Sequence, residues 1–238
     1  MAAITTIFNT ILYYPLLNIL FLLYYYLPGK DLGIAVIVLT ILIKLIFYPL
    51  GAQALKSQKA MSEIQPKIKE IQEKYKDDKE KQTKVIMEFY KEKKINPFSG
   101  CLPLLIQLPI FIALYQVFQK GLRPEAITNL YSFISHPAQI DPTFLGIVNL
   151  SQPSMFLAVL AGVSQYFQLK TAPQGPKLKQ KTSDISQMMS KQMTYFLPIF
   201  ALIICLKLPS AIALYWSVMT IFTILQQYFT LKRLKLNP

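Results

Sequence analysis

The sequence contains few charged residues for its length. Charged side chains make up 16% of the 238 residues and hydrophobic side chains 53%, whereas about a quarter of the residues in soluble domains are charged. Twenty of the 37 charged residues lie between positions 51 and 99. This distribution excludes an ordinary soluble globule. It also disfavours a disordered chain and a plain nucleic-acid binder, because the basic residues, which give a net charge of +13, lie between long apolar runs.

Residues that perform most bond-making chemistry are scarce as well. The two cysteines, Cys101 and Cys205, give no disulfide framework, and the single histidine, His136, stands beside Pro137 in a polar stretch typical of a solvent-facing loop. The sequence has no Gly-rich phosphate loop and no GxSxG elbow. We therefore expect a protein that is not an enzyme, needs no metal or cofactor and acts by binding and partition.

Long apolar runs dominate the rest of the chain. A membrane-spanning helix needs about 20 mainly apolar residues, and five segments fit this length to differing degrees: residues 32–50, 101–119, 153–169, 192–206 and 211–230. With the N-terminus outside, the cytoplasmic portions hold 20 Lys and Arg and the outer portions hold four. By the positive-inside rule, the C-terminus then lies in the cytoplasm. We expect an all-α integral membrane protein with a bundle of five transmembrane helices.

Residues 4–27 are open to two interpretations. They are long enough to span the membrane, but Pro15 interrupts them, Asn9 and Asn18 are polar, and five tyrosines favour the membrane interface. A signal peptide is disfavoured because there is no basic region at the start. A sixth span would also leave the N-terminus inside with no Lys or Arg to hold it there. We therefore expect residues 1–31 to form an interfacial helix on the outer surface.

Residues 54–95 form a charged insert with helical periodicity. After a first transmembrane helix over residues 32–53, apolar residues recur at intervals of three and four, as in a coiled-coil seam, at Met61, Ile64, Ile68, Ile71 and Tyr75. Residues 76–78 favour a turn, and residues 85–90 give a second apolar stripe. We expect an antiparallel helical hairpin in the cytoplasm. Residues 96–238 would then hold the other four spans, a cytoplasmic loop over residues 170–191 and a short basic tail.

Lys44 lies inside the first apolar run and needs an explanation. A cation near the centre of a spanning helix costs about 2.5 to 3.5 kcal/mol on insertion scales, so such residues usually face a polar cavity. Lys44 is also six residues before Leu50, about 9 Å along a helix, from where its side chain can reach the headgroups. The spacing leaves both interpretations open. Thr40 lies one turn earlier on the same face.

Polar side chains in the other apolar runs favour the cavity. Each one alone is typical of a hydrogen bond between helices, but polar groups in every long run indicate one shared hydrophilic surface. Tyr215 and Trp216 fit an aromatic belt or an internal cavity equally well. The candidate residues of this surface, a hydrophilic groove, are Lys44, Thr40, Gln107, Gln165, Gln168, Tyr215 and Trp216.

Four long stretches together resemble one known family. They are TILIKLIFYPL (40–50), MSEIQPKIKEIQEKYKDDKEK (61–81), NPFSGCLPLLIQLPIFIALYQ (96–116) and LPSAIALYWSVMTIFTILQQY (208–228). Their order and spacing are similar to those of the YidC/Oxa family of membrane protein insertases, and the resemblance covers residues 16–235. Because little sequence precedes Ile4, we expect the compact form that lacks the large extracytoplasmic domain. The short tail does not resemble the long basic tails that bind ribosomes.

The resemblance implies a protein of the bacterial plasma membrane that inserts nascent membrane proteins without nucleotide hydrolysis. Family members form a five-helix bundle with a groove that opens to the cytoplasm and to lipid and is closed outside. A cation, usually arginine, lies in that groove, and Lys44 occupies its position here. Thr40 and Trp216 match residues that face substrates in the family. The implied partners are nascent membrane proteins, lipids, the ribosome and the Sec translocon, with no specific nucleic acid.

Two other functions are open. The first is a small ion or solute transporter with Lys44 as an anion or proton site. The sequence has no matching inverted repeat, however, and no intramembrane carboxylate to pair with Lys44. The second is a chaperone that assists helix assembly without inserting helices.

Overall fold

The computed structural model describes residues 2–96, 102–120, 130–134, 140–173 and 185–236, and these are mostly helical. The predicted all-α fold is confirmed, with the addition of a β-hairpin of two residues per strand. In chain order the elements are α1 (Ala2–Phe8), a π-helical turn (Asn9–Tyr13), α2 (Tyr14–Tyr26), a 3-10 turn (Pro28–Lys30), α3 (Leu32–Ile46), α4 (Tyr48–Lys74), α5 (Lys79–Glu92), α6 (Leu102–Lys120), β1 (Thr143–Phe144), β2 (Val148–Asn149), α7 (Met155–Thr171), α8 (Ile185–Cys205) and α9 (Ser210–Leu236).

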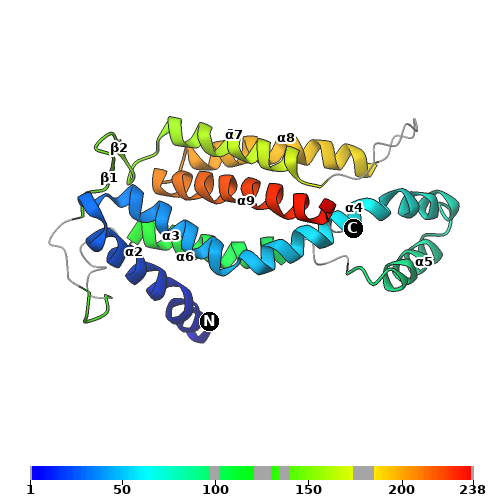
Figure 1. Ribbon diagram of the computed structural model, residues 1–238, viewed down its shortest axis with the longest axis horizontal. Coiled ribbons are helices and arrows are strands. Elements are labelled where there is room, and N and C mark those ends of the chain that lie inside the picture. Colours follow the sequence, from blue (N-terminus) through cyan, green and yellow to red (C-terminus); the bar gives the residue numbers. More distant parts are fainter. Residues whose placement is uncertain (1, 97–101, 121–129, 135–139, 174–184, 237–238) are drawn as a thin grey trace.

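Helix α9 is the central element of the bundle (Figure 1). It packs between α7 and α3 and also contacts α4, α6 and α8. Small residues allow the helices to approach closely, as is typical inside membranes. Ala158, Ala161 and Ala213 are fully buried, and a Cβ atom on Gly162 would lie 3.1 Å from the Pro198 carbonyl oxygen. Larger side chains at these positions would push α7 away from α8 and α9.

A sharp break at Phe47 separates α3 from α4. The two helices are bent by 62° relative to each other. Pro49 lies in the first turn of α4, where its missing N–H costs little, but its ring prevents the preceding helix from continuing. The segment expected as one spanning helix over residues 32–53 is therefore divided, and its straight part ends at Ile46.

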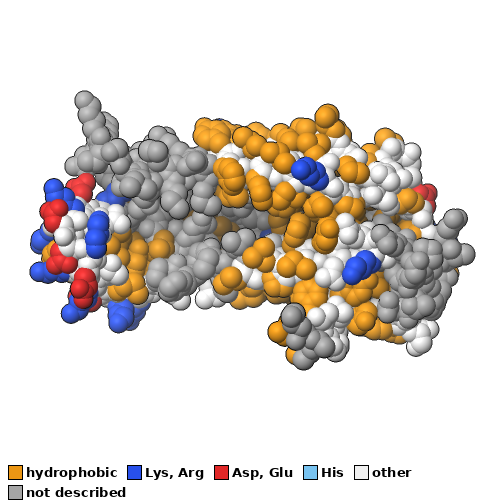
Figure 2. Space-filling model, turned by 180° about the vertical axis from the view of Figure 1, so that it is seen from behind, with side chains coloured by type: hydrophobic (Ala, Val, Ile, Leu, Met, Phe, Trp, Pro, Cys, Tyr) orange, Lys and Arg blue, Asp and Glu red, His pale blue; other side chains and the backbone are white. Residues whose placement is uncertain are grey.

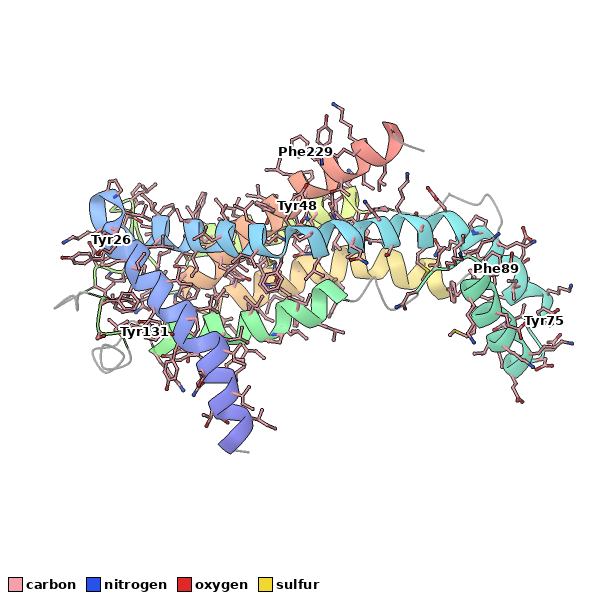
Figure 3. All side chains as sticks on the ribbon, turned by 60° about the horizontal axis from the view of Figure 1, so that its bottom comes forward. Tyr26, Tyr48, Tyr75, Phe89, Tyr131 and Phe229 are labelled. Atoms are coloured by element: carbon pink, nitrogen blue, oxygen red, sulfur yellow. The ribbon has the colours of Figure 1, made fainter. Side chains whose placement is uncertain are left out.

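Helices α4 and α5 form a charged hairpin at one end of the molecule (Figure 1). The predicted apolar stripe lies on the inner side of this hairpin. Ile68 and Ile71 are buried there, and Met61, Ile64 and Tyr75 are partly buried. Gln82 Nε2 of α5 also donates a hydrogen bond to the Gln72 carbonyl oxygen of α4 at 2.6 Å. Figure 3 shows Tyr75 and Phe89 at this end. The location of the hairpin in the cytoplasm stays a prediction.

The β-hairpin lies at the opposite end of the bundle, against the start of α3 (Figure 1). The Phe144 ring occupies space that only glycine leaves, because a Cβ atom on Gly33 would lie 2.0 Å from the ring. Asp31 caps α3 by accepting a hydrogen bond from Ile34 N at 2.9 Å, and it also accepts one from Leu145 N at 2.5 Å. The Asp31 carboxylate thus caps the first turn of α3 and also holds the β-hairpin against this helix.

The turn between α8 and α9 lies at the same end as the β-hairpin. Ser210 N donates to the Gln152 carbonyl oxygen at 2.9 Å, and Ser210 Oγ donates to the Asn149 carbonyl oxygen at 3.0 Å. Cys205, just before this turn, is buried. Cys101 and His136 lie outside the described residues.

The N-terminal helix leaves the bundle at an angle (Figure 3). Its first part exposes Ile4, Ile7 and Ile11, whereas Leu17 and Leu20 in α2 are buried. The π-helical turn ends two residues before Pro15, whose missing N–H cannot form the normal helical bond. Whether this helix lies on the membrane or crosses it stays a prediction.

Two helices among the described residues are long and apolar enough to cross a membrane, Ile4–Tyr26 and Ser210–Leu234, and a third if the bent pair α3 and α4 forms one span. With 17 residues, α7 is about 26 Å long, slightly less than a bilayer core. The number of five spans therefore stays a prediction. Figure 2 shows hydrophobic side chains over the middle of the molecule and charged side chains at the α4–α5 end.

Candidate functional site

A small pocket lies where α3, α4 and α6 meet. Its volume of about 60 Å³ gives room for on the order of four water molecules. The lining residues are Ile43, Lys44, Phe47, Leu50, Gly51, Ile106, Gln107 and Ile110. Two of the predicted groove residues, Lys44 and Gln107, therefore share one pocket although they come from different helices.

Lys44 is half-buried, and its ammonium group is directed toward α9. Nζ donates a hydrogen bond to Thr223 Oγ1 at 2.9 Å and lies 5.7 Å from the centroid of the Phe222 ring. Thr223 in turn donates to the Met219 carbonyl oxygen at 2.8 Å. None of the salt bridges within the described part of the chain includes Lys44. An ammonium group has three N–H donors, so this site can still offer hydrogen bonds to water or to an incoming carboxylate.

Gln107 connects the pocket to the interior of the bundle. Its Nε2 donates a hydrogen bond to the hydroxyl oxygen of Tyr215 on α9. Tyr215 is only 2% exposed, so its ring lies among the packed helices and not in an aromatic belt at the surface. Together Gln107 and Lys44 tie two different helices to α9.

A second polar cluster joins α9 to α7. Trp216 Nε1 donates to Gln165 Oε1 at 2.8 Å, and Gln165 Nε2 donates to Gln168 Oε1 at 2.7 Å. The Trp216 ring also meets the Phe111 ring of α6 edge to face, with centroids 5.6 Å apart. Three predicted groove residues thus form one chain of hydrogen bonds, which is separate from the lining of the Lys44 pocket.

Thr40 does not line the pocket. It is 1% exposed, and its hydroxyl donates to the Val36 carbonyl oxygen of its own helix at 2.6 Å. A threonine in a helix commonly makes this bond to the preceding turn. The spacing puts Thr40 one turn before Lys44, but the proton of its hydroxyl group is already donated to its own helix.

The structure adds a contact between α4 and α9 that the sequence did not predict. Gln226 Nε2 donates to the Tyr48 carbonyl oxygen at 2.9 Å, next to the break between α3 and α4. Gly51 permits this contact, because a Cβ atom there would lie 2.7 Å from Gln226 Nε2. Thr223 and Gln226 are three residues apart on α9, and such residues share a helix face. This spacing is the feature of the sequence from which the contact could have been expected.

The family model of the 60Kd inner membrane protein matches residues 23–237 of this chain. The match includes α3 to α9. It therefore covers every residue that lines the Lys44 pocket and every residue of the polar cluster of Gln165, Gln168 and Trp216. It begins near the end of α2, so the first part of the N-terminal helix lies outside it.

Curated relatives agree with the family match. A "Membrane protein insertase YidC" of Fusobacterium nucleatum is 36% identical over 203 residues, which cover 85% of this chain and 87% of the relative. Proteins of the same name from Francisella philomiragia and Francisella tularensis subsp. novicida are 38% and 39% identical over 196 residues. Those residues cover 82% of this chain but only 32% of each Francisella protein. The chain therefore belongs to the 60Kd inner membrane protein family, the YidC/Oxa family.

Proposed function

We propose that this protein is a membrane protein insertase of the bacterial inner membrane. Family membership, the names of the relatives and the long apolar helices support this function. We propose a topology in which α3, α6, α7, α8 and α9 cross the membrane. In it the N-terminus lies outside, and the α4–α5 hairpin and the C-terminus lie in the cytoplasm.

The observation that carries the proposal is the Lys44 side chain, which lines the pocket and directs its ammonium group to Thr223 of α9. It is half-buried in an otherwise uncharged helix, it contacts a hydroxyl group and an aromatic ring, and none of the described salt bridges neutralises it. A buried cation without a paired anion is costly, so this position favours any acidic group that approaches it. At an effective dielectric of about 20, a contact between opposite charges at 4 Å contributes about 4 kcal/mol.

The mechanism follows from partition between water and lipid. A nascent helix must bring its short polar flank across about 30 Å of hydrocarbon. A hydrated groove shortens the dry part of this path, and Lys44 offsets part of the cost for an Asp or Glu on the flank. The apolar part of the substrate then moves sideways into lipid, where its own hydrophobicity drives the last step. This route requires neither nucleotide hydrolysis nor a metal ion.

The cytoplasmic parts would receive the substrate. Residues 54–95, which include most of the α4–α5 hairpin, and the basic loop over residues 170–191 carry 17 of the 25 Lys and Arg of the chain. Such basic segments fit anionic lipid headgroups, and we propose that they also meet the ribosome and the Sec translocon.

The test is insertion of a single-span substrate into liposomes that contain the purified protein. The substrate carries an acidic outer tail, and a matched substrate carries Asn and Gln in place of the acidic residues. We expect Lys44→Glu to lower insertion of the acidic substrate at least about tenfold, since repulsion replaces attraction and about 1.4 kcal/mol corresponds to a factor of ten. Lys44→Arg keeps the charge and should retain activity.

The neutral substrate is the control, because its insertion should change little in either variant. An ion-flux measurement on liposomes without substrate separates insertion from a leak or a transport activity. Equal insertion of the acidic substrate by the wild type and by Lys44→Glu would rule out the electrostatic part of the mechanism.

A further inference from the structure

The tip of the β-hairpin exposes two large apolar side chains. Leu145 is 61% exposed and Ile147 is 82% exposed, at the end of the bundle opposite to the α4–α5 hairpin. The chain around them, residues 142–156, contains no Asp, Glu, Lys or Arg. A tip that pointed into water would normally carry polar or charged residues.

The backbone of the tip makes the choice of leucine more unusual. Ile147 N donates to the Phe144 carbonyl oxygen at 3.0 Å and closes a tight turn. Leu145 and Gly146, the two central residues, have φ angles of +52° and +67°. Two positive φ angles are typical of the turn that favours Asn, Asp and Gly, and a leucine is strained there. A leucine at this turn therefore costs free energy through its backbone in any solvent, and in water it costs more because its apolar side chain is exposed.

The base of the hairpin fixes where the tip points. The Phe144 ring fills the space beside Gly33. Asp31 accepts a hydrogen bond from Leu145 N at 2.5 Å. The strands therefore cannot easily rotate to hide Leu145 and Ile147 against the bundle.

The apolar tip belongs to the same uncharged stretch that begins the exposed apolar side of α7. Exposed apolar residues recur on this helix at Met155, Phe156, Val159, Val163 and Phe167. Their spacing of about four residues forms one stripe, which starts six residues after the last residue of β2. For a membrane that surrounds this stripe of α7, the outer boundary therefore lies only a few residues along the chain from the exposed tip.

We propose that Leu145 and Ile147 insert into the outer leaflet of the lipid bilayer. At the boundary between headgroups and acyl chains, about 5 to 10 Å deep for apolar faces that lie in the interface, the two side chains leave water. This contact would hold the end of the bundle that carries the N-termini of α3 and α9 at a fixed depth. It goes beyond the insertase function, because it concerns the bilayer and not the substrate.

The test uses the full chain with Cys101→Ser and Cys205→Ala, and with one new cysteine at Ile147→Cys. An environment-sensitive dye such as NBD is attached there, and the protein is placed in liposomes with or without lipids brominated on the acyl chains. We expect the dye at position 147 to lose a large part of its emission in the brominated liposomes. The matched control is Gln152→Cys, an exposed polar position on the same segment, where the loss should be much smaller.

A pair of variants at Leu145 separates lipid contact from backbone effects. Leu145→Asn fits the positive φ angle better but is polar, whereas Leu145→Met fits it no better than leucine but is apolar. With the dye at position 147, we expect quenching to fall in the Asn variant and to persist in the Met variant. Equal quenching in the two variants would overturn the role of Leu145.

Emission at position 147 that does not depend on bromination would overturn the proposal. In that case a blue-shifted spectrum means that the tip binds protein, such as a second copy of this chain, and an unshifted spectrum means that it lies in water. Insertion of a substrate is not the readout, so this result and that of the Lys44 experiment are independent.

Discussion

At Lys44, the stabilising contacts come from a hydroxyl group and an aromatic ring. A hydrogen bond to a charged group contributes about 1.5 to 3 kcal/mol, and a cation beside a ring about 0.5 to 2 kcal/mol. Both are weaker than a desolvated contact with a carboxylate. Thr223 and Phe222 are therefore suited to hold the ammonium group against α9, beside the pocket, and to release it when an acidic substrate arrives.

A substitution of Thr223 tests the role of this single residue. Thr223→Val keeps the shape of the side chain but removes the oxygen that accepts from Lys44, so the ammonium group is free to turn toward the headgroups. We expect insertion of an acidic-tailed substrate to fall about tenfold, in keeping with the loss of a charged hydrogen bond. Thr223→Ser retains the oxygen and should stay near the wild-type rate.

The neutral-tailed substrate shows whether this effect is electrostatic. A positioning role requires the loss to be confined to the acidic substrate. Equal losses for both substrates would show that Thr223 only supports helix packing, and no loss for either would show that Lys44 does not need it.

The sequence alone identified Lys44 but not its partner. A lone cation in an apolar run stands out by composition, whereas the Lys44–Thr223 contact joins residues 179 positions apart and depends on how α3 packs on α9. For Thr40, the sequence predicts the position of the residue but not the direction of its hydroxyl group. Its position on the helix face is predictable, but whether its hydroxyl faces a cavity or its own backbone is decided by local geometry.

Among the elements, the break between α3 and α4 has the largest effect on the site. Pro49 made a boundary near Phe47 predictable, but apolar composition continues past it, and that continuity suggested a longer helix over residues 32–53. Three pocket residues, Phe47, Leu50 and Gly51, come from the break and the first turn of α4. The Gln226 amide holds this turn against α9. The angle of 62° could not be predicted, because this junction packs against a distant helix through a contact between residues 178 positions apart.

Gly51→Ala tests this junction. The added Cβ atom would lie 2.7 Å from Gln226 Nε2, so the amide must move and its bond to the Tyr48 carbonyl oxygen is lost. We expect the free energy of unfolding in detergent to fall by about 0.5 to 1.5 kcal/mol, the net contribution of a hydrogen bond. Gln226→Ala removes both the crowded side chain and the bond, so adding Gly51→Ala to it should cost little further stability. Additive losses in the double variant would contradict this contact.

At the scale of the whole molecule, the two ends differ in chemistry. One end carries the charged α4–α5 hairpin and the C-terminal part of α9, and the other carries the β-hairpin and the turn before α9 (Figure 1). The clustering of Lys between residues 51 and 99 made the first end predictable. The second end was not, because its contacts join groups that are distant in the sequence and each includes at least one backbone group, as in the bonds from Ser210 and Leu145.

The orientation of these ends can be tested by labelling. In a chain with Cys101→Ser and Cys205→Ala, single cysteines are introduced at Thr6, Lys76 or Gln152, and intact cells are treated with a membrane-impermeant maleimide. We expect positions 6 and 152 to be labelled from outside and position 76 only after the cells are opened. If position 152 is labelled from outside but position 6 only after the cells are opened, the N-terminal helix crosses the membrane. External labelling at position 76 would reverse the proposed topology.

The absence of a carboxylate beside Lys44 within the described residues also affects substrates of the opposite kind. A flank rich in Lys and Arg would meet a like charge in a pocket where salt screens poorly, and the repulsion would keep that flank on the side where it started. The same ammonium group would thus sort the two ends of a passenger helix by sign. The charge rule that orients this chain's own loops would then be one that it enforces on the proteins it handles.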